Sequence, residues 1–228
     1  FEGHYRVQGT DFVSVSETGE VTVLGTVPGS DDVTISFTFN NITITANESL
    51  YYYNASDGFR QITDNATTGS VVGSPISNTY VSSIVMLTDG LRIYHSAFNE
   101  VAGVPGEEVF TVDADTIPEF TPDPIFALRQ AENDECIVFK KLSTEHYYLT
   151  GGAQFAFQPS NQKATRQGVS GSRAMALMNG VWYLLGRRNE TAPSCYVYQQ
   201  GQSQKIASRE IEIILSAYSD TELEAVTM

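Results

Sequence analysis

The most constraining feature of this chain is an alternation of apolar and polar residues with a period of two. Val33, Ile35 and Phe37, for example, are each separated by one polar residue. Successive side chains of a β-strand point to opposite faces, so this pattern predicts strands with one buried face. Dipeptides that favour tight hairpin turns follow several such runs, at Asp57-Gly58, Asp89-Gly90 and Asn179-Gly180. The pattern therefore predicts an all-β chain made of antiparallel hairpins.

The strands also recur with a longer period. Related strands at Phe12, Tyr51, Leu91, Tyr147 and Tyr196 follow one another about every 40 to 55 residues. This spacing suits blades of four antiparallel strands, and it predicts a β-propeller. The signatures of the WD40 and kelch repeats are absent from the sequence. A β-sandwich with irregular loops is the structural alternative.

Residues 1–207 are expected to form the propeller blades, and two stretches interrupt their strand pattern. Residues 99–124 are rich in Pro, Gly and acidic side chains. Residues 155–171 mix Gln, Ser, Asn and Gly with isolated apolar side chains. Clusters of these residue types are typical of connections, so both stretches are predicted to be long loops between strands.

Residues 208–228 differ in character from the blades and predict a short helical tail. Ser208 precedes the apolar and charged run Arg209–Leu215. Farther on, Ser219 stands three residues before Glu222, which is the spacing of a capping box at the start of a helix. A second short helix is therefore expected over residues 221–226.

The charge of the chain limits the partners that it can bind. The sequence has 13 Lys and Arg against 27 Asp and Glu, a formal net charge of −14. Tight binding of a nucleic-acid backbone needs clustered basic residues, so this balance argues against a protein that grips nucleic acid. The longest apolar runs are too short to span a membrane, and no membrane segment is expected.

The residue types that usually carry chemistry are few and scattered. His4, His95 and His146 each stand beside a Tyr without a second ligand at metal-binding spacing, so each is expected at the surface or partly packed. Cys136 and Cys195 lie in apolar runs and are expected to be buried free thiols, with a disulfide between them as the alternative. The closest acid pairs are Asp31-Asp32 and Asp113 with Asp115. We expect no catalytic, cofactor-binding or metal-binding residues.

The C-terminal half resembles a known family of phage proteins. The segments that carry the resemblance are 136–139, 145–151, 166–171, 174–185, 193–198, 201–208, 211–214 and 218–223. The last three segments, between residues 201 and 223, are the most specific. Residues 4–7 and 50–62 match the family more weakly. In order and spacing they are similar to the tail-hub, or packaged-DNA stabilisation, protein of short-tailed bacteriophages. Members of that family are longer, so the resemblance implies part of a hub protein or a shortened relative.

The resemblance implies a structural function in the virion tail without a cofactor. Such hubs form a ring, a homohexamer, below the portal and its head-to-tail adaptor. They extend and seal the DNA channel, stabilise the packaged DNA, and support the tail needle or plug and the tailspikes. Genomic DNA passes through the lumen during ejection, and we expect an acidic lumen to hold it only weakly.

A second hypothesis is a carbohydrate-binding or glycan-cleaving β-propeller, either secreted or attached to a phage tail. Aromatic side chains such as Trp182 and Tyr183 are able to stack on sugars, but beside the Asn179-Gly180 turn they are expected to pack within a blade. Glycosidases need two carboxyl groups at a defined separation, and the sequence does not show such a pair. We therefore expect a protein that is not an enzyme.

Overall fold

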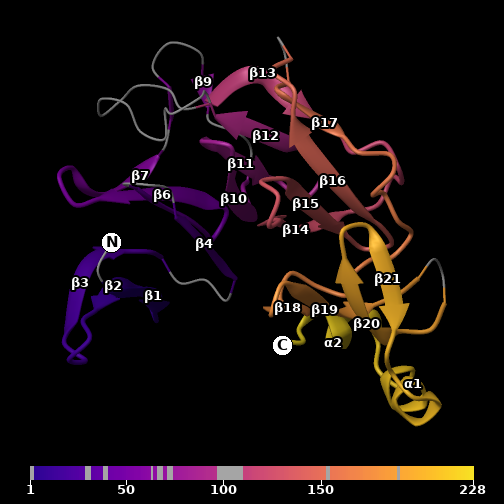
Figure 1. Cartoon of the computed structure of the whole chain (residues 1–228). Coiled ribbons are helices and arrows are strands. Elements are labelled where there is room, and N and C mark those ends of the chain that lie inside the picture. The colour runs from indigo at the N-terminus through magenta and orange to yellow at the C-terminus, as the bar shows by residue number, and fades with distance from the viewer. Residues whose placement is uncertain are drawn as a thin grey trace. The chain divides into compact units, whose positions relative to one another are not determined.

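The computed structural model describes residues 3–28, 32–37, 41–62, 64–65, 69–70, 74–96, 110–152, 155–188 and 191–228. Its strands form antiparallel sheets in which strands adjacent in sequence are also adjacent in space (Figure 1). The chain divides into two compact units, Phe1–Asp89 with Ile93–Asp115 and Gly90–Arg92 with Thr116–Met228. The predicted all-β fold, with four-stranded antiparallel sheets, is confirmed.

The first unit contains a three-stranded sheet, two four-stranded sheets and a two-stranded ribbon. The three-stranded sheet consists of β1 (His4–Gln8), β2 (Asp11–Val15) and β3 (Val21–Thr26). The first four-stranded sheet consists of β4 (Val33–Phe37), β5 (Ile42–Ala46), β6 (Ser49–Asn54) and β7 (Gly58–Ile62). The ribbon pairs β8 (Asp64–Asn65) with β9 (Gly69–Ser70). The second four-stranded sheet consists of β10 (Ser77–Val81), β11 (Ile84–Thr88), β12 (Ile93–Ser96) and β13 (Phe110–Thr116).

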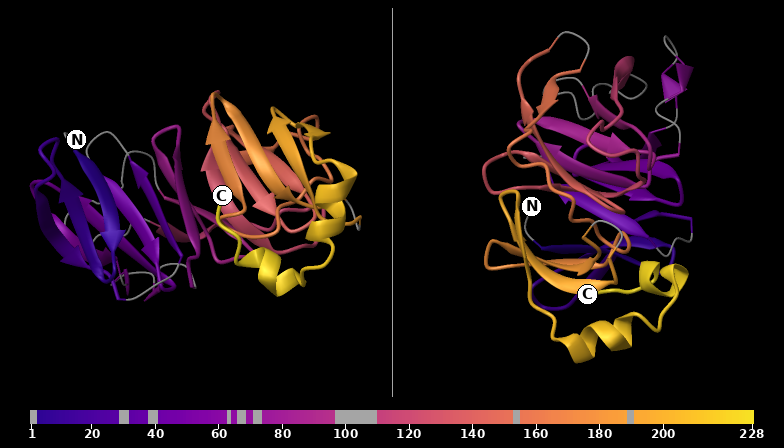
Figure 2. Two further views of the ribbon diagram at one scale, coloured as in Figure 1. Left: turned by 90° about the horizontal axis from the view of Figure 1, so that it is seen from below. Right: turned by 90° about the vertical axis from the view of Figure 1, so that its right-hand side faces the viewer.

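The second unit contains two four-stranded sheets followed by two short helices. The first sheet consists of β14 (Ile125–Gln130), β15 (Cys136–Lys140), β16 (Thr144–Leu149) and β17 (Phe157–Pro159). The second sheet consists of β18 (Met175–Met178), β19 (Val181–Gly186), β20 (Ser194–Gln199) and β21 (Gln202–Lys205). The helices are α1 (Arg209–Leu215) and α2 (Asp220–Glu224), and both lie beside the last sheet (Figure 2).

The predicted hairpin turns adopt the backbone conformations that their residues favour. Asn179 and Gly180 join β18 to β19 with φ angles of 52° and 75°. A type I′ turn needs positive φ at both central positions, which Asn and Gly tolerate better than other residues. Gly58 and Gly90, in the other two predicted turns, also have positive φ.

Apolar and aromatic side chains bury the faces of the sheets. In the second unit, Ile137 and Phe139 of β15 pack with Trp182 of β19 and Tyr198 of β20 in one buried cluster. The rings of Phe139 and Trp182 meet edge to face, with centroids 5.3 Å apart. This cluster joins the two four-stranded sheets of the unit into one core.

Strands occupy part of each stretch that the sequence predicts to be a loop. Within 99–124, residues Phe110–Thr116 form β13, and residues 99–109 lie outside the described residues. Here Val112 and Ala114 alternate with polar side chains, but the acidic surroundings hid this pattern. Within 155–171, residues Phe157–Pro159 form β17, which pairs with the end of β16.

The short helical tail is confirmed, although its second helix differs slightly from the prediction. That helix begins at Asp220 and ends at Glu224, instead of covering residues 221–226. Its capping box is present as expected, with Ser219 and Glu222 bonding to each other's backbone. The prediction that residues 1–207 are blades and 208–228 a tail stays a prediction as a division into domains.

Candidate functional site

One surface site of the second unit is formed where helix α2 attaches to the sheets. A helix of five residues does not form alone in water, so α2 depends on contacts with the rest of the unit. The Ser219 backbone N–H donates to Glu222 Oε2 at 2.8 Å, and the Glu222 N–H donates to Ser219 Oγ at 3.3 Å. The capping box therefore starts the helix, and tertiary contacts must hold it in place.

The main apolar contact of α2 is made by Leu223. Its side chain is only 2% exposed and packs with Ala174 and Leu185. On the adjacent backbone, a Cβ atom added to Gly171 would lie 2.3 Å from the carbonyl oxygen of Glu224. A larger residue at position 171 would therefore displace helix α2 from the surface against which Leu223 packs.

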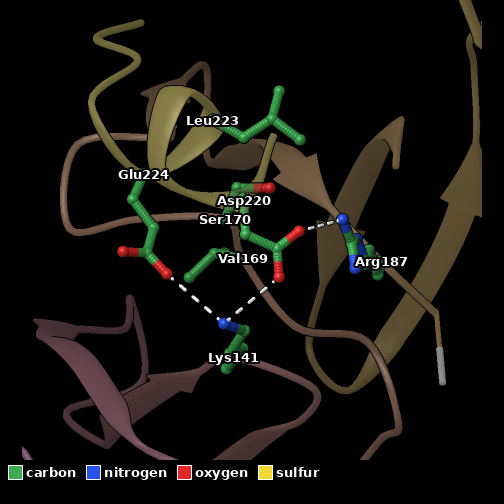
Figure 3. Close-up of a pocket in the computed structure, with 7 residues that line it drawn as sticks. All are labelled: Lys141, Val169, Ser170, Arg187, Asp220, Leu223 and Glu224. Atoms are coloured by element: carbon green, nitrogen blue, oxygen red, sulfur yellow. Dashed lines mark hydrogen bonds and ion pairs between the residues drawn. The ribbon is translucent and has the colours of Figure 1, made fainter. Parts of the chain in front are cut away.

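Ion pairs surround this contact, and we call the whole arrangement the α2 clasp (Figure 3). Lys141 Nζ lies 3.4 Å from Asp220 Oδ2 and 3.3 Å from Glu224 Oε1. Arg187 pairs with the other oxygen of Asp220. Partial burial tends to raise the pKa of Asp220, but Arg187 and Lys141 outweigh this effect and lower that pKa.

Helix α1 presents apolar side chains to the surroundings. None of its residues is buried, and Leu215 at its end is half-buried against the cluster that holds Leu223. Ile213 and Ile214 are 64% and 59% exposed. The large exposed apolar residues in and beside the helix are Ile206, Ile211, Ile213, Ile214 and Tyr218. Such a concentration is unusual for a surface that stays in contact with water.

A buried ion-pair network stabilises the first sheet of the second unit. The Lys140 ammonium group is 1% exposed and lies 3.0 Å from Glu145 Oε1 and 3.3 Å from Asp123 Oδ1. It also donates to the carbonyl oxygen of Thr121, and the Tyr147 hydroxyl donates to Glu145 Oε2 at 3.3 Å. A buried charge needs such partners, because removing it from water is costly.

His146 is the histidine whose surroundings the sequence did not predict. It is 1% exposed, whereas a surface or partly packed position was expected. Its Nδ1 donates to Glu135 Oε2 at 2.9 Å, and its Nε2 accepts from the Tyr198 hydroxyl at 2.6 Å. Lys163 lies on the other side of Glu135, 2.6 Å from Oε1. The partners lie up to 52 residues away in the chain, so no local motif could have revealed this network.

The network also sets the protonation of its members. Burial lowers the pKa of His146, and the hydrogen bond and charge of Glu135 only partly oppose this effect. Burial by itself would raise the pKa of Glu135, but Lys163 and His146 outweigh it and lower that pKa. A neutral imidazole between a carboxylate and a phenol is the consistent state.

The structure does not bring the remaining candidate residues together into a site. His4 is exposed, and Nδ1 of His95 lies 2.8 Å from the carbonyl oxygen of Ser96. Cys136 and Cys195 are free thiols as predicted, and burial raises the pKa of Cys136. Asp31 and the Asp113 side chain lie outside the described residues, whereas Asp32 is exposed and Asp115 half-buried.

In the described part of the chain, no group of three or more His, Cys, Asp or Glu side chains is placed to hold a metal ion. Among the same residues, no helix is long and apolar enough to cross a membrane.

Comparison with protein families gives one match over almost the whole length. The family model described as "Phage_stabilise: Bacteriophage P22 Gp10, beta-propeller" matches residues 2–228. No curated protein matches the chain.

Several solved structures are similar to this chain in fold but distant in sequence. The extracellular domain of a two-component system protein from B. thetaiotaomicron gives a TM-score of 0.58 at 14% identity, with 90% of this chain and 26% of that one covered. A streptogramin B lyase gives 0.56 at 11% identity, covering 91% and 66%. Virginiamycin B lyase from Staphylococcus aureus gives 0.53 at 9% identity, covering 88% and 64%. The chain thus spans less than two thirds of each, and the likeness concerns the fold alone.

We predict that Leu223, and not the ion pairs, provides most of the stability of the α2 clasp. Leu223→Ala should destabilise the attachment by about 2–5 kcal/mol, the usual cost of a buried Leu→Ala change. Partly exposed ion pairs contribute about 0–1 kcal/mol each, so Asp220→Asn should have a small effect. Hydrogen exchange of the amides of residues 219–228 measures both changes. Ile117→Ala is the control, because Ile117 is an exposed side chain of the second unit that lies outside both helices. The prediction would be contradicted if Ile117→Ala reduced protection as much as Leu223→Ala does.

We also predict that His146 makes the second unit less stable as the pH falls from 7.5 to 5.5. The unfolded His146 takes up a proton near pH 6.5, but the folded residue has a lowered pKa and resists protonation. The unfolded state therefore binds more protons, and stability falls by up to about 1.4 kcal/mol per pH unit in this range. Urea unfolding, followed by the fluorescence of Trp182, measures this slope.

The His146→Gln variant should flatten this pH dependence, while His4→Gln should leave it unchanged because His4 is exposed. Comparing slopes separates the protonation effect from any general loss of stability caused by the substitution. An unchanged slope in His146→Gln would show that another group is responsible.

Proposed function

Since the chain belongs to the phage stabilisation family described as bacteriophage P22 Gp10, a β-propeller family, we propose that it is a structural component of the virion tail that lines and seals the DNA channel. The family is one of phage structural proteins, and the match extends over residues 2–228. That match is the observation that carries the proposal. The rigid antiparallel sheets suit a component that other proteins pack against.

The charge distribution supports passage of DNA without tight binding. All the lysines of the chain, Lys140, Lys141, Lys163 and Lys205, form ion pairs with carboxylates. Arg187 is likewise paired with Asp220. A carboxylate beside a cation offsets part of its attraction for phosphate, so these residues add less to DNA affinity than unpaired cations would. The excess of acidic residues repels DNA at longer range.

The exposed face of α1 supports assembly with other copies of the chain. We propose that this face contacts a different surface of a neighbouring copy, because such head-to-tail contacts close into rings. A ring, a hexamer in the resemblance described above, would continue the channel below the portal and its adaptor. Contacts with the adaptor, the tail needle or plug, and the tailspikes belong to the same proposal.

The proposal predicts weak binding of duplex DNA. The isolated protein should bind with a dissociation constant weaker than about 100 µM at physiological salt, the weak end of non-specific binding. The double variant Asp220→Asn/Glu224→Gln leaves Lys141 and Arg187 without their carboxylate partners. It should bind DNA measurably at low salt, as followed by the fluorescence anisotropy of a labelled duplex.

The matched control Glu17→Gln/Glu20→Gln removes the same charge from an exposed turn of the first unit. This control should bind duplex DNA no better than the unchanged protein. That result is expected if the unpaired Lys141 and Arg187, and not the net charge of the protein, determine DNA affinity. Tight binding by the unchanged protein that weakens steeply with salt would overturn the proposal of a weakly binding channel.

The proposal also predicts self-association through α1. The variant Ile213→Lys/Ile214→Lys should shift the mass distribution from oligomer to monomer in native mass spectrometry, because lysines cannot be buried at an apolar contact without a large cost. The control Val21→Lys/Val23→Lys changes similarly exposed apolar residues of β3 and should leave assembly intact. A monomeric unchanged protein at high concentration, or equal loss in both variants, would contradict the assignment to α1.

A further inference from the structure

A pocket of about 340 Å³ opens between the two four-stranded sheets of the second unit. Its lining comes from matching turns of the two sheets, the β14–β15 turn and the β18–β19 turn, and from the β20–β21 turn. The residues that line it are Gln130, Ala131, Glu132, Ile137, His146, Leu177, Gly180, Trp182, Gln199 and Gln200. Its volume falls in the range of small-molecule sites in proteins.

One part of the lining is aromatic and apolar, and its shape is fixed. Trp182 is 9% exposed and held edge to face against Phe139. His146 is locked by its hydrogen bonds to Glu135 and Tyr198, so its ring contributes a rigid and uncharged wall. Leu177 is 53% exposed beside them. A pre-formed wall of this kind favours binding, because little side-chain entropy is lost when a ligand arrives.

The other part of the lining is rich in side-chain amides. Gln199 Nε2 donates to the carbonyl oxygen of Gly180 at 3.5 Å, and Gln130 Nε2 donates to Asp134 Oδ1 at 3.2 Å. Each amide has two donor hydrogens and two acceptor lone pairs, so these bonds leave capacity for a ligand. Glu132 adds a carboxylate next to Gly180, where an added Cβ would lie 2.2 Å from Glu132 Oε1.

The charges of the lining select the class of ligand. Glu132 is the charged residue of the lining, which contains neither Lys nor Arg among the described residues. A phosphate or carboxylate would meet repulsion without a compensating cation. A wholly apolar ligand would bury the amides of Gln130 and Gln199 without hydrogen bonds, which is costly. A neutral ligand with several hydroxyl groups and an apolar face can pack against the aromatic part of the lining and form hydrogen bonds with its amides.

We propose that this pocket binds a neutral saccharide, with one sugar face against Trp182 and its hydroxyl groups toward the glutamine amides and Glu132. The aromatic side chain offers its face or edge to the C–H groups of the sugar, and the amides and carboxylate pair with its hydroxyls. This inference is independent of the role in the DNA channel, since it rests on the second unit alone and requires no assembly.

Trp182 makes the test direct, because it is the only tryptophan of the chain. The intact protein is titrated with hexoses, N-acetylhexosamines and their neutral disaccharides, and Trp182 fluorescence is recorded. At least one of these should give a saturable change with a dissociation constant on the order of millimolar. The 6-phosphate of the binding sugar should bind at least tenfold more weakly. Absence of a saturable change from every neutral saccharide up to about 100 mM would overturn the proposal.

Two matched variants locate the binding site. Gln199→Leu removes an amide of the pocket and should weaken binding at least fivefold. Gln204→Leu makes the same change on exposed β21, outside the lining, and should leave binding unchanged. Glu132→Gln should reduce the discrimination against the sugar phosphate. Equal binding by Gln199→Leu and Gln204→Leu, or unchanged discrimination in Glu132→Gln, would overturn the assignment to this pocket.

Discussion

The second unit depends on the burial of one sheet face by the next. A four-stranded sheet with an apolar face is not stable alone in water, and each sheet must find a partner. Ile137 and Phe139 of β15 meet this requirement by packing against Trp182 and Tyr198 of the following sheet. The alternation of the strands is what makes such a contact possible, because it collects apolar side chains on one face. This packing fixes the positions of the two sheets. The connections, the helices and the polar networks are attached to the sheets and are positioned by them.

The polar networks illustrate how the packing determines chemistry. Tyr198 belongs to the core cluster, yet its hydroxyl reaches Nε2 of His146 on the neighbouring sheet. The imidazole thereby lies where burial favours its neutral form, and Glu135, which pairs with Lys163, contacts its other nitrogen. A buried polar group with all its partners is stable and fixes the relative position of the elements that carry it. His146 therefore acts in the structure as a positioning group between two sheets.

Most of the fold could be predicted from the sequence, because its signals are local. Alternation and the turn at Asn179-Gly180 depend on neighbouring residues, and so does the capping box at Ser219. The missed strand β13 shows where such signals fail, since its alternation is short and lies among acidic residues. The candidate sites were harder to predict. The α2 clasp joins Lys141 to residues about eighty positions away, and such pairings depend on tertiary structure.

The contrast between the two helices bears on assembly. Both are too short to form alone, so each needs contacts that compensate for the loss of chain entropy. Helix α2 has them in the buried side chain of Leu223 and the surrounding ion pairs. Helix α1 has the partly buried Leu215 and the ion pair of Lys205 with Glu212, while Ile213 and Ile214 remain exposed. An apolar face on an otherwise weakly held helix gains stability when another surface covers it. The ring contact that we propose would cover this face with a further copy of the chain.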